Sequence, residues 1–390
     1  MAVLDLAAEP PRRVALAAAG PPPAGAGGDY VPGLDGLRAL SISVVVLGHL
    51  GFGALLPGGL GVTVFFFVSG YLITGLLMVE HARNGRVDLP RFYGRRFLRL
   101  TPELLAFLAV AGLVLAPLFG QTVPPVQLAA ALTYWTNYLI LGGWGDCARC
   151  VTTGHLWSLA VEEHFYLLMP AALAACAFLP RRAAGLLLAV IAACALWRWA
   201  AFTRLGLSEV YTYKATECRL DSIAWGCLAA VAERSWPQVL GLVRRRAWAL
   251  VAAGCALMLL SLAWREETFR ATWRYSVQTA ALFLLVPALT RAPRTAVVTG
   301  LLEQAPLRWM GRRSYAAYLW HYAALTVASF AVGWGGRDLE AAPRALQLLA
   351  LPLVLAGTWT AAELSHRFVY APAQRLKPWL LPRRAPVPAA

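Results

Sequence analysis

Ten apolar stretches, each long enough to cross a bilayer as a helix, constrain the fold of this chain more than any other feature. Backbone groups inside a bilayer must find their hydrogen-bond partners within the protein, and apolar runs of about 20 residues satisfy this requirement as helices. The sequence therefore predicts an all-α, polytopic membrane protein. The stretches fall near residues 37–56, 60–79, 97–119, 157–179, 183–204, 216–234, 246–264, 272–291, 314–333 and 346–368.

The composition agrees with a membrane protein, because 59% of the 390 residues are hydrophobic and only 14% are charged. Soluble domains are roughly half apolar and about a quarter charged. The net charge of +15 raises the question of nucleic-acid binding. The basic residues lie in short loops between apolar runs, where membrane topology explains them, so we expect no nucleic-acid partner.

An eleventh apolar stretch, 126–141, is shorter than the roughly 20 residues that a membrane-spanning helix needs. Whether it crosses the membrane determines the orientation of every later loop. If this stretch does not cross, most of the 35 lysines and arginines fall on one side, which the positive-inside rule assigns to the cytoplasm. We therefore predict ten spanning helices, one short re-entrant or interfacial helix, and both termini in the cytoplasm.

The ends of the chain are expected to be tails around one membrane domain. Residues 1–29 contain arginines followed by Pro- and Gly-rich sequence with no apolar signal region, so we predict a flexible cytoplasmic tail. The membrane domain is predicted over 30–372, with a second cytoplasmic tail over 373–390. Cys147 and Cys150 form a lone CxxC in a polar loop, and if that loop faces an oxidising compartment a local disulfide is favoured over a metal site or thioredoxin-like chemistry.

Two ionisable residues, Arg38 and His49, bracket ten uncharged residues within the first apolar stretch. On an ideal helix they lie within about 20° of one face and about 16 Å apart. Ionisable groups in hydrocarbon are costly, so such a pair usually lines a polar cavity, where a neutral imidazole can accept a proton from a hydroxyl. The alternative is a snorkelling arginine and a histidine bonded to a neighbouring helix. Asp35, three residues before Arg38, has the spacing of a structural ion pair.

Arginines 95, 96 and 99 follow Tyr93 at the start of the third stretch. Positive charge at a helix N-terminus opposes the helix dipole unless an anion occupies the site. Guanidinium groups suit bidentate phosphate binding, so this pattern indicates a phosphate-bearing ligand. The alternative is that the arginines serve topology alone.

Two adjacent carboxylates, Glu162 and Glu163, lie near the start of the fourth stretch beside Trp157, Ser158 and Tyr166. Burying such a pair is expensive. The pattern suits a carbohydrate subsite or a carboxylate that assists the intramembrane histidine. Interfacial solvation with an aromatic belt is the alternative.

Two weaker groups of polar residues are interpreted as structural. Arg219 and Asp221 lie near an outer helix end and are expected to pair with each other. Arg312 and Arg313 precede the ninth full-length stretch and are expected to be topological, and the aromatic residues that follow them are expected to pack in the core.

Together these stretches resemble the acyltransferase-3 family of integral membrane O-acyltransferases. The matching segments are Leu34–Ala39 with His49, Phe65–Thr74, Phe92–Pro102, His155–Glu163 and Ser314–His321. The resemblance implies transfer of an acyl group, most often acetyl, from cytoplasmic acyl-CoA to a hydroxyl. The expected acceptors are carbohydrates, cell-envelope glycans, or glycosylated and macrolide-type metabolites.

The resemblance also assigns roles to individual residues. It implies His49 as the catalytic base, Arg38 as its partner, and Glu162 or Glu163 as support for the reaction centre. Acyl-CoA would be the co-substrate, with no metal, in a bacterial-type plasma membrane. Residues expected to bind acyl-CoA are Tyr93, Arg95, Arg96 and Arg99, and those expected to bind the acceptor are Asp35, Ser69, Trp157, Ser158 and Tyr166.

Two positions depart from the family pattern, and one other function remains open. His164 stands where the family often has glutamine, and Tyr370 stands where a glutamate is common. The competing interpretation is a proton-coupled transporter or flippase that uses His49 and the intramembrane carboxylates as a relay. We find no repeat halves and no pair of Pro- or Gly-broken helices that would favour it.

Overall fold

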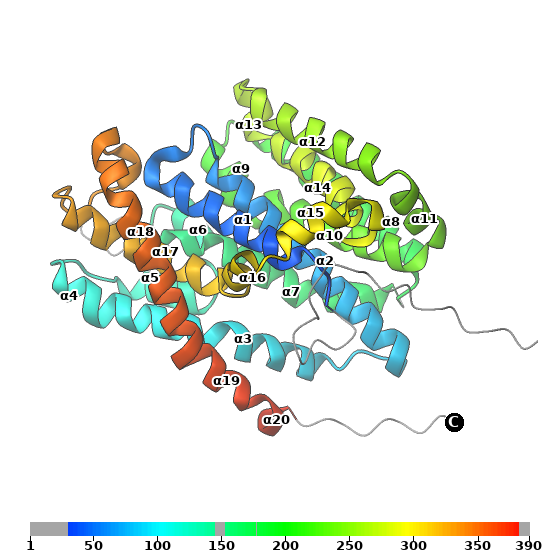
Figure 1. Ribbon diagram of the computed structural model, residues 1–390, viewed down its shortest axis with the longest axis horizontal. Helices are drawn as coiled ribbons and strands as arrows, with labels where there is room; N and C mark the ends of the chain where they lie inside the picture. The colour runs from blue at the N-terminus through cyan, green and yellow to red at the C-terminus, as the bar shows by residue number, and fades with distance from the viewer. Residues whose placement is uncertain (1–29, 145–152, 177, 382–390) are drawn as a thin grey trace, which may run out of the picture. The chain divides into compact units, whose positions relative to one another are not determined.

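The apolar stretches fold into helices, and the residues that the structure describes contain no strand. The computed structural model describes residues 30–144, 153–176 and 178–381 (Figure 1). The first predicted tail, the Cys147–Cys150 pair and the last part of the second tail lie outside these residues. From Val31 onward the chain belongs to one compact unit.

Each of the ten predicted stretches corresponds to one long helix in the described part of the chain (Figure 1). Their bounds are α1 Leu34–Leu47 continued by η1 Gly48–Phe52, α2 Gly58–Asn84, α3 Leu89–Val110 continued by η2 Ala111–Leu115 and α4 Ala116–Leu118, α7 Trp157–Ala175, α8 Pro180–Thr203, α10 Thr216–Ser235, α12 Ala247–Ala263, α14 Arg274–Arg291, α17 Ser314–Ala331, and α18 Arg344–Ser365 continued by η6 His366–Tyr370.

Shorter helices connect or flank the long ones. They are α5 Pro125–Leu132, α6 Thr136–Leu141, η3 Gly154–Leu156, α9 Glu209–Lys214, α11 Pro237–Arg245, α13 Glu267–Ala271, η4 Pro293–Thr295, α15 Ala296–Leu302, α16 Ala305–Arg312, η5 Leu339–Ala341, α19 Ala371–Arg375 and α20 Lys377–Leu380.

Length and apolar composition qualify five of the described helices as membrane spans, or seven if each of two bent helix pairs counts as one. The bends are 84° between α11 and α12, and 89° between α14 and the η4–α15 segment. The remaining long helices, α7, α10 and α17, carry buried polar side chains that lower their hydropathy. An all-α membrane fold is thus supported, and the count of ten spans stays a prediction.

Contacts between helix ends fall into two sets, which we call the proximal end, where α1 begins, and the distal end. At the proximal end Arg95 at the start of α3 pairs with Glu80 near the end of α2, at 2.9 Å. At the distal end Arg344 at the start of α18 donates to the Gly51 carbonyl at 3.1 Å. These contacts place the end of α2 beside the start of α3, and the end of the α1–η1 helix beside the start of α18, as expected for spanning helices that alternate in direction.

The marginal stretch 126–141 is broken into two short helices, α5 and α6, with Tyr134 between them at a φ of 58°. At 1.5 Å per residue, helices of this length cover about 9–12 Å, far short of the roughly 30 Å hydrocarbon core. Asn137 on α6 donates to Thr216 at the start of α10, at 2.9 Å. Since α5 and α6 both lie at the distal end, this stretch starts and finishes on one side.

Helix α10 is central, since it packs against α2, α7, α8 and α14. Glycines let α2 and α10 approach closely, as is common between membrane helices. A Cβ on Gly70 would lie 2.1 Å from the Ile223 carbonyl oxygen, and one on Gly226 would lie 2.0 Å from that of Phe67.

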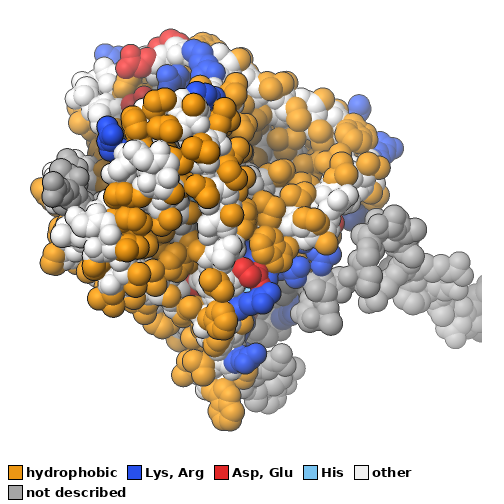
Figure 2. All heavy atoms as spheres, turned by 60° about the vertical axis from the view of Figure 1, so that its left-hand side comes forward, with side chains coloured by type: hydrophobic (Ala, Val, Ile, Leu, Met, Phe, Trp, Pro, Cys, Tyr) orange, Lys and Arg blue, Asp and Glu red, His pale blue; other side chains and the backbone are white. Residues whose placement is uncertain are grey.

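The outer surface is largely apolar. Figure 2 shows one face on which hydrophobic side chains dominate. Large aliphatic side chains such as Leu113, 79% exposed, and Leu118, 67% exposed, point outward. A contiguous apolar surface of this kind is unusual for a protein surrounded by water and fits a lipid environment.

A fully buried ion pair joins α8 to α10, between Arg198 and Asp221 at 2.9 Å. Arg198 also donates to the Thr272 carbonyl at 2.5 Å and to the Ser276 hydroxyl at 2.6 Å. The prediction that Arg219 is the partner of Asp221 was therefore wrong, because position 198, distant in sequence, supplies the cation.

We expect Asp221→Asn to destabilise the protein by about 3–5 kcal/mol, because it leaves the Arg198 charge buried without its counterion. The check is the thermal unfolding midpoint in detergent. The control is Glu209→Gln, which removes a half-exposed pair with Arg270 at 3.8 Å and should cost at most about 1 kcal/mol. Equal midpoints for the two variants would contradict the structural role of the buried pair.

Candidate functional site

His49 lies where α1 widens into the π-helical turn η1, near the distal end. Such turns are rare and frequently occur at functional sites. Gly51 supports the turn with a φ of 103°, and a Cβ there would lie 2.1 Å from the Gln347 amide nitrogen. Glycine is required here because L side chains rarely adopt this conformation.

His49 belongs to a group of four aromatic rings from three elements, which we call the histidine cluster: His49 on η1, His155 on η3, and His321 and Tyr322 on α17. The His49 ring centroid lies 5.3 Å from that of His321 and 4.9 Å from that of Tyr322. The His155 ring stacks on Tyr322 at 4.6 Å. His49 therefore faces polar aromatic groups rather than aliphatic side chains. Within the described residues, no histidine, cysteine or carboxylate group has a metal-holding arrangement.

A second group, the carboxylate cluster, joins α2, α3 and α7. Arg96 lies 3.6 Å from Glu163, and its guanidinium stands 3.2 Å from the Tyr166 ring centroid. The Tyr166 hydroxyl hydrogen-bonds to that of Ser69, which also interacts with Glu162. The structure thus brings together four residues predicted for catalysis or acceptor binding around one arginine predicted for donor binding.

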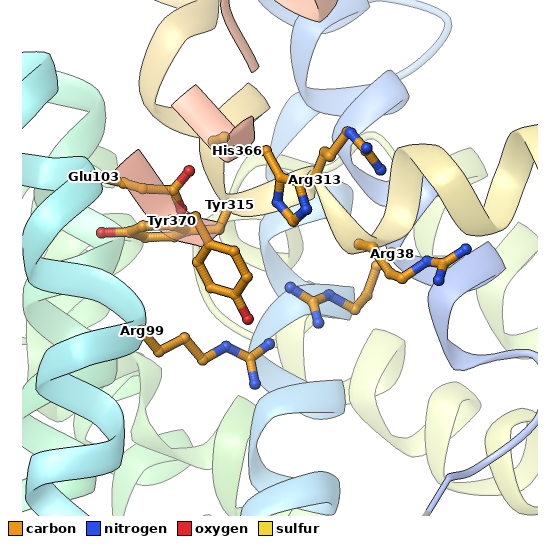
Figure 3. A pocket seen from close by; sticks show the side chains of 9 residues that line it. Arg38, Arg99, Glu103, Arg313, Tyr315, His366 and Tyr370 are labelled. Carbon is orange, nitrogen blue, oxygen red and sulfur yellow. The ribbon is translucent and has the colours of Figure 1, made fainter. Parts of the chain in front are cut away.

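A third group is a pocket at the proximal end, which we call the arginine pocket (Figure 3). Arg313 is neutralised by Glu363. By contrast, Arg38, Arg99 and Arg312 have no carboxylate partner within 4.0 Å among the described residues. Four arginines and one carboxylate, Glu103, line the pocket, and this excess of guanidinium groups indicates a site for an anion. The pocket is lined by Arg38, Arg99, Glu103, Arg312, Arg313, Tyr315, Ala316, His366 and Tyr370.

The arginines predicted to act together at the start of α3 separate in the structure. Arg95 pairs with Glu80, Arg96 joins the carboxylate cluster, and only Arg99 lines the pocket. Tyr93 lies away from all three groups and donates to the Leu167 carbonyl at 3.0 Å. The separation arises because successive helical residues point in different directions around the axis.

The remaining predicted acceptor residues lie in different places. Ser158 bonds to the Tyr318 hydroxyl at 2.7 Å, and Trp157 packs on Tyr213 with ring centroids 4.7 Å apart. Asp35 lies at the proximal end against α16, and no ion pair within 4.0 Å joins it to Arg38 in the described structure. The expected Asp35–Arg38 pair therefore forms no contact within 4.0 Å, although the two charges interact electrostatically.

Helix α7 connects the histidine and carboxylate clusters by a row of polar side chains. Ser158 and Glu162 lie four residues apart, about 6 Å along one face. Tyr318, the partner of Ser158, also donates to the His155 carbonyl at 2.5 Å. None of the described contacts of Glu162 or Glu163 reaches His49, so the carboxylates do not touch the predicted base directly.

Residues that the sequence did not mark as functional complete both groups. Arg312 enters the pocket from the end of α16, His321 lies beside His49, and His155 contacts His321. Arg312 was interpreted as topological, since positive charge in a short loop needs no other explanation. The two buried histidines were a usable signal, because His321 lies within an apolar stretch and His155 directly precedes one, and such residues are rare in membrane spans.

The family model and the relatives that this chain matches are all described as acyltransferases. A family model described as "Acyltransferase domain" matches residues 31–363. The chain is 28% identical over 365 residues to the peptidoglycan O-acetyltransferase OatA of Listeria monocytogenes, covering 89% of this chain and 56% of that protein. It is also 28% identical over 361 residues to the O-acetyltransferase OatA of Staphylococcus aureus, covering 89% and 57%.

The chain thus spans a little over half the length of these relatives. No solved structure matches it.

Proposed function

The chain belongs to the acyltransferase-domain family, and on that premise we propose that it is a membrane O-acetyltransferase in which His49 is the general base and the arginine pocket binds the donor. The donor would be acyl-CoA, most often acetyl-CoA, and the acceptor a hydroxyl. The observation that carries the proposal is the gathering of Arg38, Arg99 and Arg312 in one pocket, where none of them forms an ion pair within 4.0 Å in the described structure and Glu103 is the one carboxylate of the lining.

The pocket suits the phosphates of acyl-CoA for an electrostatic reason. Guanidinium groups of like charge repel one another, and a polyanion that enters between them removes the repulsion and accepts charge-assisted hydrogen bonds. The proximal end carries most of the basic loops, so the positive-inside rule places it in the cytoplasm. Arg38 and His49 are about 16 Å apart along α1, a separation that the pantetheine arm would have to cover.

The proposed reaction is a single acyl transfer. His49 takes the proton of the acceptor hydroxyl as its oxygen attacks the thioester carbonyl carbon. The carbon–sulfur bond then breaks, and the departing CoA thiolate takes up a proton. An ester and free CoA are the products. The acid–base step supplies a factor of about 10²–10⁴ in rate.

The acceptor class is proposed from the relatives, because Trp157 is only 4% exposed and packs on Tyr213, so it presents no open aromatic face to a sugar. One relative is named for peptidoglycan O-acetylation. We therefore favour a glycan hydroxyl over a small natural product.

The test is transfer of labelled acetyl from acetyl-CoA in proteoliposomes, with peptidoglycan fragments and a macrolide as alternative acceptors. Mass spectrometry should detect one added acetyl ester on the glycan. Proton-coupled uptake without any acetylated product would instead support the transporter, for which the polar row on α7 would be the proton path.

Orientation can be tested by single cysteines at the two ends. Arg83→Cys, at the exposed end of α2, should react with a membrane-impermeant maleimide only from the cytoplasmic side. Leu205→Cys, after α8 at the distal end, should react only from the outside. The native chain measures background labelling, and the reverse pattern would invert the proposed topology.

A further inference from the structure

Two buried histidines of the histidine cluster have no role in the reaction as proposed, although His321 lies beside His49 and His155 contacts His321. His321 is completely buried and His155 is 3% exposed. The His321 ring is held by its Nδ1, 2.6 Å from the Tyr318 carbonyl, and the His155 ring by its Nε2, 3.2 Å from the Leu319 carbonyl. A carbonyl can only accept, so each of these nitrogens carries the proton and donates it.

In the neutral ring, the opposite nitrogen is consequently unprotonated and can accept a hydrogen bond. These atoms, His321 Nε2 and His155 Nδ1, are buried and have no hydrogen-bond partner in the described structure. A buried acceptor without a hydrogen bond is destabilising, so we expect each of these nitrogens to find a donor. His49 Nδ1 is also buried without a hydrogen bond of good geometry, although the Val45 carbonyl one turn earlier interacts with the ring.

The ring separation permits His49 to be that donor. Two imidazoles joined by an N–H···N bond of about 2.9–3.0 Å have centroids roughly 5 Å apart. The observed separation of His49 and His321 is 5.3 Å. His49 is less buried than its neighbours and lies in a widened helical turn, so a small rotation of its ring can bring the two nitrogens together.

We propose that His321 is a positioning residue for His49, accepting the His49 Nδ1–H at its own Nε2 so that His49 Nε2 faces the acceptor hydroxyl as the base. The inference rests on the proposed function. When His49 takes up the hydroxyl proton, the same bond stabilises the imidazolium that forms. This is the orienting role that a carboxylate plays in a Ser-His-Asp triad, filled here by a neutral ring.

Among the described groups around His49, no carboxylate is placed to accept the proton of its Nδ1, which leaves His321 as the candidate acceptor. The charged residues that act on His49 are Asp338 and Lys214, both on distal segments outside the histidine cluster. No carboxylate of the described residues forms an ion pair or hydrogen bond with the His49 ring. Tyr322 packs between His49 and His155, at 4.9 Å and 4.6 Å, and so separates His155 from a direct stack on the base.

The test compares three variants in the acetyl-transfer assay. His321→Ala should lower kcat by about 10–150-fold, the value of a hydrogen bond to a charged group, and leave the KM for acetyl-CoA unchanged. His321→Gln places an amide oxygen near the position of Nε2 and should recover much of the activity. His321→Asn places its oxygen near Nδ1 instead and should not.

The melting temperature separates positioning from packing. Glutamine and asparagine should give similar melting temperatures and different kcat values. Wild-type kcat in His321→Ala, or equal loss in the Gln and Asn variants together with lower melting temperatures, would overturn the inference. His81→Ala is the matched control, since that ring stacks on Phe178 at the proximal end, 4.1 Å away. Retained acetyl transfer in His49→Ala would instead refute His49 as the base, regardless of the results for the His321 variants.

Discussion

Replacement of His49 by alanine is expected to lower kcat for acetyl transfer by about 10²–10⁴-fold, because the group that removes the acceptor proton is lost. The fold should survive, since the ring is not fully buried and makes no well-formed hydrogen bond in the described structure. The measurements are the rate of acetyl ester formation and the thermal midpoint in the same detergent.

Added imidazole sharpens this experiment. Free imidazole entering the space left by the side chain should restore part of the rate in His49→Ala and should not affect the native protein. His81→Ala serves again as the control for loss of a histidine. Full activity in His49→Ala would reject this residue as the base.

The second large effect is expected at the arginine pocket. Arg99→Ala should raise the KM for acetyl-CoA by about 10–150-fold, because one charge-assisted hydrogen bond to a phosphate is removed. Arg99 has no carboxylate partner in the described structure, and in Figure 3 the Tyr370 hydroxyl points toward its guanidinium. Loss of its charge relieves repulsion from Arg38, so the melting temperature of the ligand-free protein should not fall.

The KM for acetyl-CoA and the melting temperature of Arg99→Ala together distinguish a ligand site from a structural cluster. Arg83→Ala is the matched control, because this arginine is exposed at the same end of the bundle and lies outside the pocket. An unchanged donor KM in Arg99→Ala would show that the pocket does not hold the donor. A lower melting temperature with an unchanged KM would assign Arg99 to the scaffold.

Much of the fold was predictable because its signals are local. Runs of about 20 apolar residues predicted the ten long helices, and the short stretch around Tyr134 was correctly separated from them. The family was predictable for a related reason, since motifs such as Leu34–Ala39 and His155–Glu163 are short and contiguous, and the family match over residues 31–363 confirms it.

The site was only partly predictable. Arg38 and His49 stood out because charge or an imidazole within an apolar run is costly, and Arg99 because positive charge at a helix N-terminus opposes the helix dipole. The sequence treated Arg95, Arg96 and Arg99 as one group, whereas each faces a different neighbour. Spacing along a helix specifies relative direction, but it does not specify which helix lies in that direction.

The sequence by itself determined the helices, their alternation and the residues whose burial needed a reason, because the bilayer acts on every segment separately. Only the tertiary structure decided the partners. Asp221 pairs with Arg198 rather than Arg219, Arg312 joins Arg99, and His321 reaches His49 across 272 positions of the chain. These choices depend on how closely whole helices pack, which side-chain volumes and close glycine contacts set over long sequence separations.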